Sequence, residues 1–252
     1  MLKQLLGFSI FLLLPLSAIA QEQGGPYHSG NWYSLSYIYD DFRYEEPGAM
    51  KETGPLPGLH GDFGINMMPW LTLGGGFQYV SGNLTYDGAT FGGTPVTTLT
   101  KDRNWHINMR VYFFADPIEF SIGWARRYLY NNLVVSYRRE ETYNFIPIAL
   151  TYKFQPFYAT YEYRNFVSGE NLTHMSDVSS AQRDVKFKQD TGSGFSLEFG
   201  YIIPAQPVST KVFLRYDYWH VAQSDIQNDN TQNLVEPDNN TREIFLGIGV
   251  IY

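Results

Sequence analysis

The sequence WHINMRVYF, residues 105–113, decides the class of fold. Apolar or aromatic side chains at positions 105, 107, 109, 111 and 113 alternate with those of His106, Asn108, Arg110 and Tyr112. Because successive side chains of an extended strand point to opposite faces, this period of two predicts a strand with one apolar and one polar face. An amphipathic helix would instead repeat its apolar residues every three to four positions.

The same alternation appears in nine other segments of the chain. Their cores are residues 33–40, 59–67, 71–80, 118–125, 146–154, 157–164, 195–201, 212–218 and 244–252. After residue 20, no apolar stretch approaches the roughly 20 residues that a membrane-spanning helix needs. The sequence therefore predicts an all-β protein of about ten strands. Eight or twelve strands are the alternatives, because residues 133–143 and 184–191 are ambiguous.

The connections between these segments alternate in length. The short ones are centred on Met68-Pro69, Asp116-Pro117, Gln155-Pro156 and residues 204–207, and each contains proline; the long ones cover residues 45–58, 87–102, 129–137, 168–188 and 221–240. A soluble sandwich can also contain ten alternating strands, but it has no reason to sort its loops in this way. Tight turns at one end and long polar loops at the other are typical of transmembrane antiparallel up-and-down β-barrels. Both termini are then expected at the periplasmic end.

The composition is compatible with such a barrel. The 252 residues include no cysteine, which excludes a disulfide scaffold, a thiolate metal site and a cysteine nucleophile. The net charge of -7 argues against a nucleic-acid binder. The mean hydropathy of -0.27 resembles that of a soluble protein, but an average over lipid face, lumen and polar loops gives a similar value. Aromatic residues, 17% of the chain, suit the two girdles at the membrane interfaces.

Residues 1–20 have the pattern of a cleaved signal peptide. Lys3 precedes an apolar run over residues 5–16, and Ala18 and Ala20 supply the small residues that signal peptidase reads. The run is short for a membrane anchor and contains Pro15. We therefore expect an exported protein whose barrel domain covers residues 21–252.

The last strand carries a resemblance at the level of a motif. In FLGIGVIY, residues 245–252, Gly247, Val250 and Tyr252 match the pattern with which outer-membrane barrels end, while Phe245 stands where that pattern has a polar residue. The sequence resembles small Gram-negative outer-membrane β-barrel proteins, the porin-like and OmpA-like barrels. This resemblance implies a place in the cell outer membrane among its lipids, help from periplasmic chaperones, and recognition of this motif by the insertion machinery. It also implies a monomer without a cofactor.

Charged residues on the polar strand faces are expected to fill the barrel. The acidic ones are Asp40, Asp62, Glu119, Glu162, Glu198 and Asp217, and the basic ones are Arg110, Arg127, Lys153, Arg164, Lys211 and Arg215. Balanced signs predict a paired network, because an unpaired buried charge is costly and a selectivity filter favours one sign. We therefore expect a non-enzymatic protein without a metal site: a structural barrel or a narrow channel for small solutes.

An outer-membrane hydrolase is the alternative function. His174-Met175-Ser176 has the spacing of the His-x-Ser pair in barrel lipases and lipid A deacylases, and Asp217 with His220 is faintly similar to the Asp–His pair of omptin-like proteases. Polar loops rich in Ser, Asp and His also produce such matches by chance.

Three arginines are candidates for contact with the phosphates of lipopolysaccharide. Arg126 lies near the outer end of its strand, and Arg138 and Arg139 begin the next strand. Arginine binds phosphate with two parallel hydrogen bonds, which suits this contact. Salt bridges with Glu140 and Glu141 at the barrel rim are the alternative role.

Overall fold

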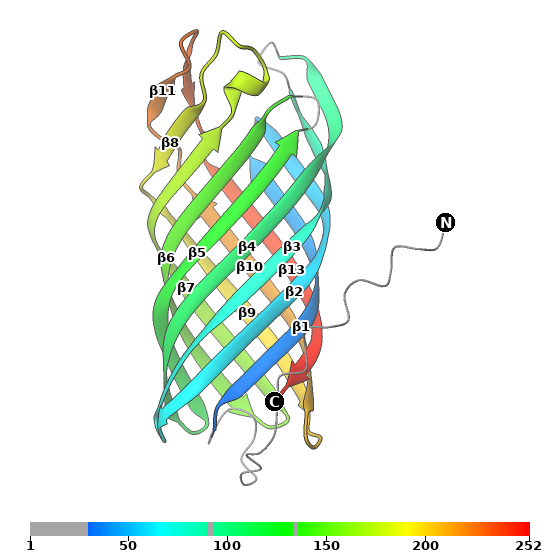
Figure 1. Cartoon of the computed structure of the whole chain (residues 1–252), viewed down its shortest axis with the longest axis vertical. Coiled ribbons are helices and arrows are strands. Elements are labelled where there is room, and N and C mark those ends of the chain that lie inside the picture. The colour runs from blue at the N-terminus through cyan, green and yellow to red at the C-terminus, as the bar shows by residue number, and fades with distance from the viewer. Residues whose placement is uncertain (1–29, 90–92, 134–135) are drawn as a thin grey trace, which may run out of the picture.

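A computed structural model describes residues 30–89, 93–133 and 136–252, so the expected signal peptide lies outside the described part. Ten long antiparallel strands form a barrel that is closed by the pairing of β6 with β7 (Figure 1). They are β1 Trp32–Glu46, β2 Met50–Met68, β3 Leu71–Ala89, β4 Pro95–Ala115, β5 Ile118–Leu133, β6 Arg138–Phe154, β7 Phe157–Thr173, β9 Gly192–Ile203, β10 Ser209–Val221 and β13 Asn239–Ile251. The predicted all-β, ten-stranded antiparallel barrel is confirmed. In the described ranges, no helix is long and apolar enough to cross a membrane.

The two ends of the barrel differ. At the end that we call the turn end, neighbouring strands are joined by short connections that contain Pro69, Pro117, Pro156 and Pro207, and the C-terminus lies there (Figure 1). The opposite end, the loop end, carries four short elements: the 3-10 helix η1 Met175–Asp177 and the strands β8 Val185–Gln189, β11 Ile226–Asn228 and β12 Asn233–Val235. The predicted sorting of short turns to one end is therefore present.

Three of the five predicted long loops are wrong, because strand continues through most of them. Only residues 47–49 separate β1 from β2, and residues 134–137 separate β5 from β6. Most of residues 87–102 likewise belongs to β3 and β4. Most outward side chains of these extensions are polar, as Asp41, Arg43 and Lys101 show, with Leu99 as an exception, so the continuous apolar face on which the prediction relied is missing. Residues 184–191 contain β8. This strand pairs with residues 169–173 of β7, which lie nearer the loop end than the residues of β7 that pair with β9.

Large apolar side chains are exposed in a belt around the half of the barrel next to the turn end. On β1 the belt includes Tyr33, Leu35, Tyr37 and Tyr39, and the next outward residue is the charged Asp41. Most other strands of the ring change in the same way from apolar to polar outward residues, although Leu99 on β4 and Val167 on β7 are exposed apolar side chains farther toward the loop end. A continuous belt of exposed apolar groups is expected of a surface that faces lipid rather than water. The ten segments predicted from the period of two coincide with this belt.

The interior of the barrel changes in the opposite sense. Next to the turn end it is lined by polar and charged side chains, whereas from mid-height toward the loop end it contains two clusters of buried apolar side chains. These are Ile38, Phe42, Tyr44, Leu56, Val80, Leu84, Leu129, Tyr143, Phe213, Val221 and Phe245, and the smaller group Ala125, Phe145 and Trp219. We call the two clusters together the apolar plug. Along the barrel, the polar lining next to the turn end is thus followed toward the loop end by the apolar plug.

Candidate functional site

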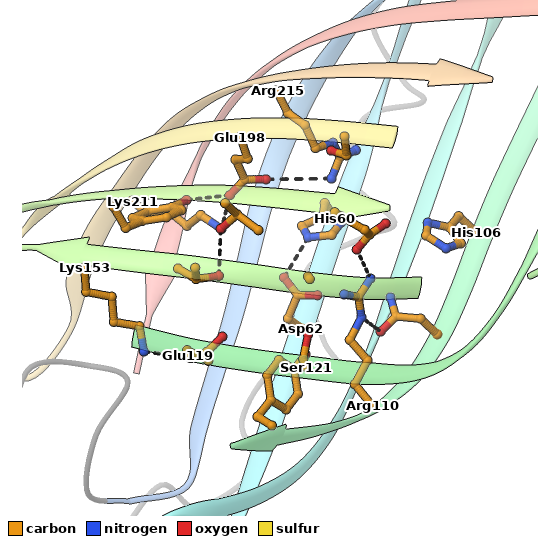
Figure 2. Close-up of a pocket in the computed structure, with 18 of the residues that line it drawn as sticks. His60, Asp62, His106, Arg110, Glu119, Ser121, Lys153, Glu198, Lys211 and Arg215 are labelled. Atoms are coloured by element: carbon orange, nitrogen blue, oxygen red, sulfur yellow. Dashed lines mark hydrogen bonds and ion pairs between the residues drawn. The ribbon is translucent and has the colours of Figure 1, made fainter. Parts of the chain in front are cut away.

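A polar cavity of about 140 Å³ lies inside the half of the barrel next to the turn end (Figure 2). His60 and Asp62 from β2, Arg110 from β4, and Glu119 and Lys153 from β5 and β6 are among the residues that line it. A buried water occupies roughly 30 Å³, and pockets for organic ligands measure about 300–1,000 Å³. The cavity therefore has room for a few water molecules or one very small solute.

The charged side chains that were predicted to lie in the lumen do face it. The shortest ion pairs that they form are Arg110–Glu162 at 2.6 Å, Lys153–Glu119 at 2.7 Å, Arg164–Glu162 at 2.7 Å, Arg127–Glu243 at 2.9 Å, Arg164–Asp217 at 2.9 Å and Lys211–Glu198 at 3.2 Å. Arg215 lies 3.4 Å from Asp217, and His60 Nε2 lies 2.6 Å from Asp62 Oδ2. Glu243 is a member that the sequence reasoning missed, since it precedes the expected core of the last strand by one residue.

Asp40 differs from the other members of this network. Its side chain is fully buried on β1, but within the described part of the chain neither carboxylate oxygen has a hydrogen-bond partner. Burial disfavours its charge, Glu243 and Asp217 repel it, and Arg127 and Arg215 attract it more weakly. The lumen is therefore a paired network in which, among the described residues, Asp40 has no direct hydrogen-bond partner.

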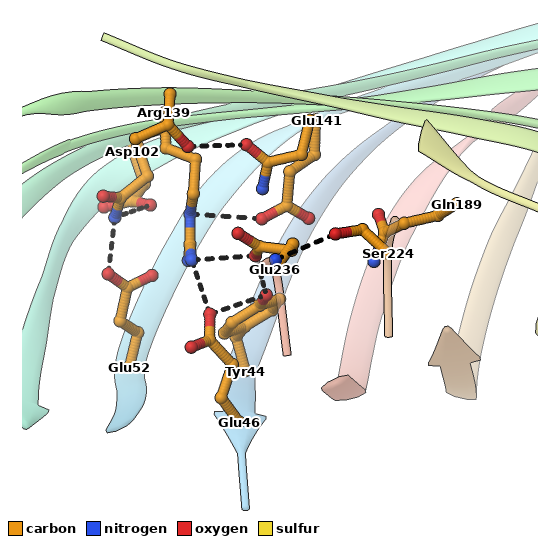
Figure 3. A network of polar contacts seen from close by, with 12 residues as sticks. Tyr44, Glu46, Glu52, Asp102, Arg139, Glu141, Gln189, Ser224 and Glu236 are labelled. Carbon is orange, nitrogen blue, oxygen red and sulfur yellow. Dashed lines mark hydrogen bonds and ion pairs between the residues drawn. The ribbon is translucent and has the colours of Figure 1, made fainter. Parts of the chain in front are cut away.

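A second charged network, the mouth network, lies inside the barrel toward the loop end (Figure 3). Its centre is Arg139, whose guanidinium forms ion pairs with Glu46 at 2.5 Å, with Glu141 at 3.2 Å and with Glu236 at 3.2 Å. The guanidinium carbon also lies 4.9 Å from the centre of the Tyr44 ring. The expectation that Arg139 contacts lipopolysaccharide on the outer surface is therefore wrong. Residue 139 has the same parity on β6 as the inward-facing Glu141 and Tyr143, and its side chain is only 4% exposed.

Further carboxylates belong to this mouth network. Asn131 Nδ2 donates to Glu52 Oε1 at 2.7 Å and to Asp102 Oδ2 at 3.0 Å, which links β5 to β2 and β4. Glu236 comes from the loop before β13, where its backbone N–H donates to Ser224 Oγ at 2.9 Å. Burial raises the pKa of Glu236, the nearby Glu46 and Glu141 raise it further, and Arg139 opposes them. Sequence reasoning missed these residues because most of them lie in segments that were expected to be loops.

The two remaining long loops pack against each other as one folded unit. This loop unit consists of residues 174–191 and 222–238. Met175, Val185 and Phe187 form its apolar centre, against which Leu234 packs. Backbone hydrogen bonds join the two segments, from Arg183 N–H to the Asp229 carbonyl at 3.0 Å and from Asp225 N–H to the Lys188 carbonyl at 3.2 Å. The loop unit therefore has its own small core above the barrel wall.

His174 attaches the loop unit to β6. Its Nε2 lies 3.0 Å from Glu140 Oε1, and its Nδ1 lies 2.8 Å from Asp184 Oδ2. Ser176 Oγ donates to Asp184 Oδ1 at 2.6 Å, so the hydroxyl is engaged by the acid rather than by the imidazole. A serine nucleophile needs a hydrogen bond to its base, and the structure does not bring His174 and Ser176 together in that way. Asp217 and His220 likewise lie on opposite faces of β10.

The stability of the loop unit is expected to depend on pH through His174. Burial alone would lower the pKa of His174, but hydrogen bonds to Glu140 and Asp184 outweigh burial and raise it above the ordinary value. The stabilisation is fully present below the unfolded pKa of about 6.5 and is lost as pH rises through the folded pKa. The loss should be about 1 kcal/mol or less, because water screens these partly exposed pairs. Amide hydrogen exchange in residues 174–191, corrected for the intrinsic rate, measures it.

His174→Gln is the matched variant for this experiment, since it keeps a polar side chain without the titration. Its loop unit should exchange at a corrected rate that changes less with pH than that of the wild type. Parallel pH profiles for the two proteins would contradict the assignment to His174.

The other two arginines named as lipid contacts lie in different settings. Arg138 is half-buried and is paired with Asp177, with Nε 2.8 Å from Oδ2. Arg126 is exposed on the outer surface of β5, where its Nε donates to Asn144 Oδ1 at 2.9 Å.

Within residues 30–89, 93–133 and 136–252, no group of three or more His, Asp or Glu side chains is arranged to hold a metal ion.

A closed ten-stranded barrel with an apolar belt outside and charged groups inside has the fold of outer-membrane β-barrel proteins. Among solved structures, it is similar to the outer membrane protease OmpT from Escherichia coli, with 12% sequence identity and a TM-score of 0.52 over 92% of this chain and 99% of that chain. It also matches a FadL homologue from Pseudomonas aeruginosa (7% identity, TM-score 0.38, 90% of this chain and 91% of that chain). A third match is Ail from Yersinia pestis (10% identity, TM-score 0.35, 89% and 100%). No family model and no curated protein sequence matches the chain. The resemblance to outer-membrane barrels that was drawn from the sequence is confirmed at the level of the fold.

Proposed function

We propose that this protein is a closed, non-conducting barrel of the outer membrane, which holds its loop unit rigidly above the lipid surface. The apolar plug is the observation that carries this proposal. A barrel of ten strands encloses a narrow interior, since the interior of an eight-stranded barrel is just filled by side chains. Here Phe145, Phe213 and Phe245 are almost completely buried, and the rings of Phe145 and Phe213 lie beside His106 and His60, which line the cavity. A hydrated ion would have to displace these side chains to pass, which favours a structural role over a channel.

The conductance of the refolded protein in a planar lipid bilayer tests the proposal. The expected record is flat, with no stepwise current at either polarity, because ions would have to displace the side chains of the plug. A porin refolded and inserted by the same procedure serves as the positive control. Reproducible current steps from the wild-type protein would show that the lumen conducts and would contradict a closed barrel.

Insertion into the outer membrane is part of the same proposal and is supported by the position of the last strand. Val250 and Tyr252 point outward from β13 and are exposed within the apolar belt. Gly247 faces the lumen, where a Cβ atom would lie 2.2 Å from Phe213 Cε1, so the glycine makes room for this ring of the plug. We propose that the outward side chains are read by the insertion machinery, and that Gly247 is required by packing in the finished barrel.

A further inference from the structure

Several basic residues of the extension have an acidic partner on the same surface. Arg43 pairs with Glu45, Lys51 with Asp87, and Lys186 with Glu170, as the half-buried Arg138 does with Asp177. In the described part of the chain, no carboxylate lies within 4.0 Å of the charged groups of Lys101 and Arg103 on β4 or of Arg126 on β5. The same holds for Arg183, Lys188 and Arg242, but these do not lie together on neighbouring strands with an aromatic pair beside them. Lys101, Arg103 and Arg126 are all exposed on the outward faces of two neighbouring strands. We call these three residues the basic patch.

The position of the basic patch is defined by the aromatic residues beside it. Trp105 on β4 is paired with Tyr128 on β5, and their rings are stacked with centroids 5.3 Å apart. Arg103 follows Trp105 on the side of the loop end, and its guanidinium lies over the Tyr130 ring at 4.6 Å. Aromatic rings of this kind mark the interface between lipid chains and headgroups. Lys101 and Arg103 therefore lie on the loop-end side of this aromatic pair and Arg126, opposite Ile107, lies on its turn-end side, so the basic patch spans the upper border of the apolar belt.

The contacts of the two arginines hold their charges at separate points of the outer surface. In the β4–β5 register, Arg103 is opposite Tyr130, four residues along β5 from Arg126. Four residues of strand span about 13 Å, so the two arginines would meet different phosphate groups of a headgroup. Stacking on Tyr130 holds the Arg103 guanidinium on the outer surface, and Arg126 lies 5.7 Å from the centre of the Trp124 ring.

We propose that the basic patch binds the phosphate groups of lipopolysaccharide in the outer leaflet. This inference rests on the proposed location in the outer membrane, and it replaces Arg138 and Arg139 in the set expected from sequence. Three positive charges without acidic partners, at headgroup height on a lipid-facing surface, are complementary to a lipid with more than one phosphate. Arginine offers paired donors that match phosphate oxygens, and lysine adds a third charge.

Binding of purified lipid A to the refolded full-length protein in neutral detergent tests the inference, with native mass spectrometry as the measurement. The variant combines Lys101→Ala, Arg103→Ala and Arg126→Ala. Its matched control combines Arg43→Ala, Lys51→Ala and Lys186→Ala, which removes the same charge from exposed positions that have acidic partners. Removal of the basic patch should weaken binding by about tenfold or more, and the control by less than about threefold. Far-ultraviolet circular dichroism and gel mobility without heating verify that each variant is folded.

Three results would overturn the inference. Equal losses in the two variants would assign binding to overall charge. Wild-type protein that binds dephosphorylated lipid A as tightly as the phosphorylated form would exclude phosphate as the recognised group. Equally tight binding of phosphatidylglycerol would exclude lipopolysaccharide as the specific source. Failure of the proposed function is seen separately, as conductance of the wild type or its absence from the outer-membrane fraction, since the binding assay uses purified components.

Discussion

Replacing Arg139 with methionine is expected to lower the free energy of unfolding by about 3–5 kcal/mol at neutral pH. The substitution keeps an unbranched side chain of similar length but removes the cation that faces Glu46, Glu141 and Glu236. Buried carboxylates would then repel each other without compensation, which is the costly way to break an ion-pair network. Urea unfolding of the refolded barrel, followed by tryptophan fluorescence, measures the change.

Two further variants make this result specific. Arg126→Met removes a charge from the outer surface and should change stability by no more than about 0.5 kcal/mol. Adding Glu46→Gln and Glu236→Gln to Arg139→Met should recover a large part of the loss, because Glu141 is then the only one of the three paired carboxylates left in place. A loss that persists in the triple variant would mean that Arg139 acts through packing against Tyr44 rather than through charge.

Gly58→Ala is expected to lower the free energy of unfolding by about 3 kcal/mol, the upper part of the range for overpacking, or to prevent folding. A Cβ atom at this position would lie 1.9 Å from the Tyr79 carbonyl oxygen and 2.7 Å from the Val80 Cα atom. Both are backbone atoms of β3, so no side-chain rotation relieves the contact. Strand β2 must move away from β3, just where Pro55 and Pro57 provide no N–H for the ladder.

Gly61→Ala is the matched control on the same strand. The nearest atom to its added Cβ would be the Ser34 carbonyl oxygen at 3.5 Å, an ordinary van der Waals contact. Its stability should stay within about 0.5 kcal/mol of the wild type, as for other surface substitutions. The yield of folded barrel and the urea midpoint compare the two variants. Equal behaviour would show that the β2–β3 seam tolerates a side chain at residue 58.

The lipid-crossing part of the barrel was predictable because lipid imposes a local pattern. Where a strand has lipid on one side and a polar lumen on the other, each pair of neighbours such as Met109 and Arg110 records both environments. The lumen residues followed from the same parity, as did their orientation toward oppositely charged neighbours. The proline-containing turns then supplied the strand order.

The mouth network and the loop unit were not predictable, since their contacts join residues far apart in the chain. Arg139 meets Glu46 across 93 residues and Glu236 across 97. No local pattern selects these partners, because the closure of the barrel and the fold of a loop bring them together. One signal was nevertheless present. Extending the strand pattern of residues 146–154 back toward residue 139 places Arg139 on the lumen face with Tyr143 and Glu141.

The change from apolar to polar outward side chains along a strand has a consequence for the evolution of this chain. Along β3, Phe77 and Tyr79 are exposed in the apolar belt while Gln78 faces the lumen, but farther along Leu84 is buried inside and Thr85 is exposed. Odd positions of one strand are thus selected for apolar residues in one half and for polar residues in the other. The substitutions tolerated at residue 77 should therefore be mainly apolar and those at residue 85 mainly polar, although both side chains point out of the same wall. A substitution model that exchanges the apolar and polar preferences of alternate positions at the border of the apolar belt should therefore detect homologues of this protein more readily.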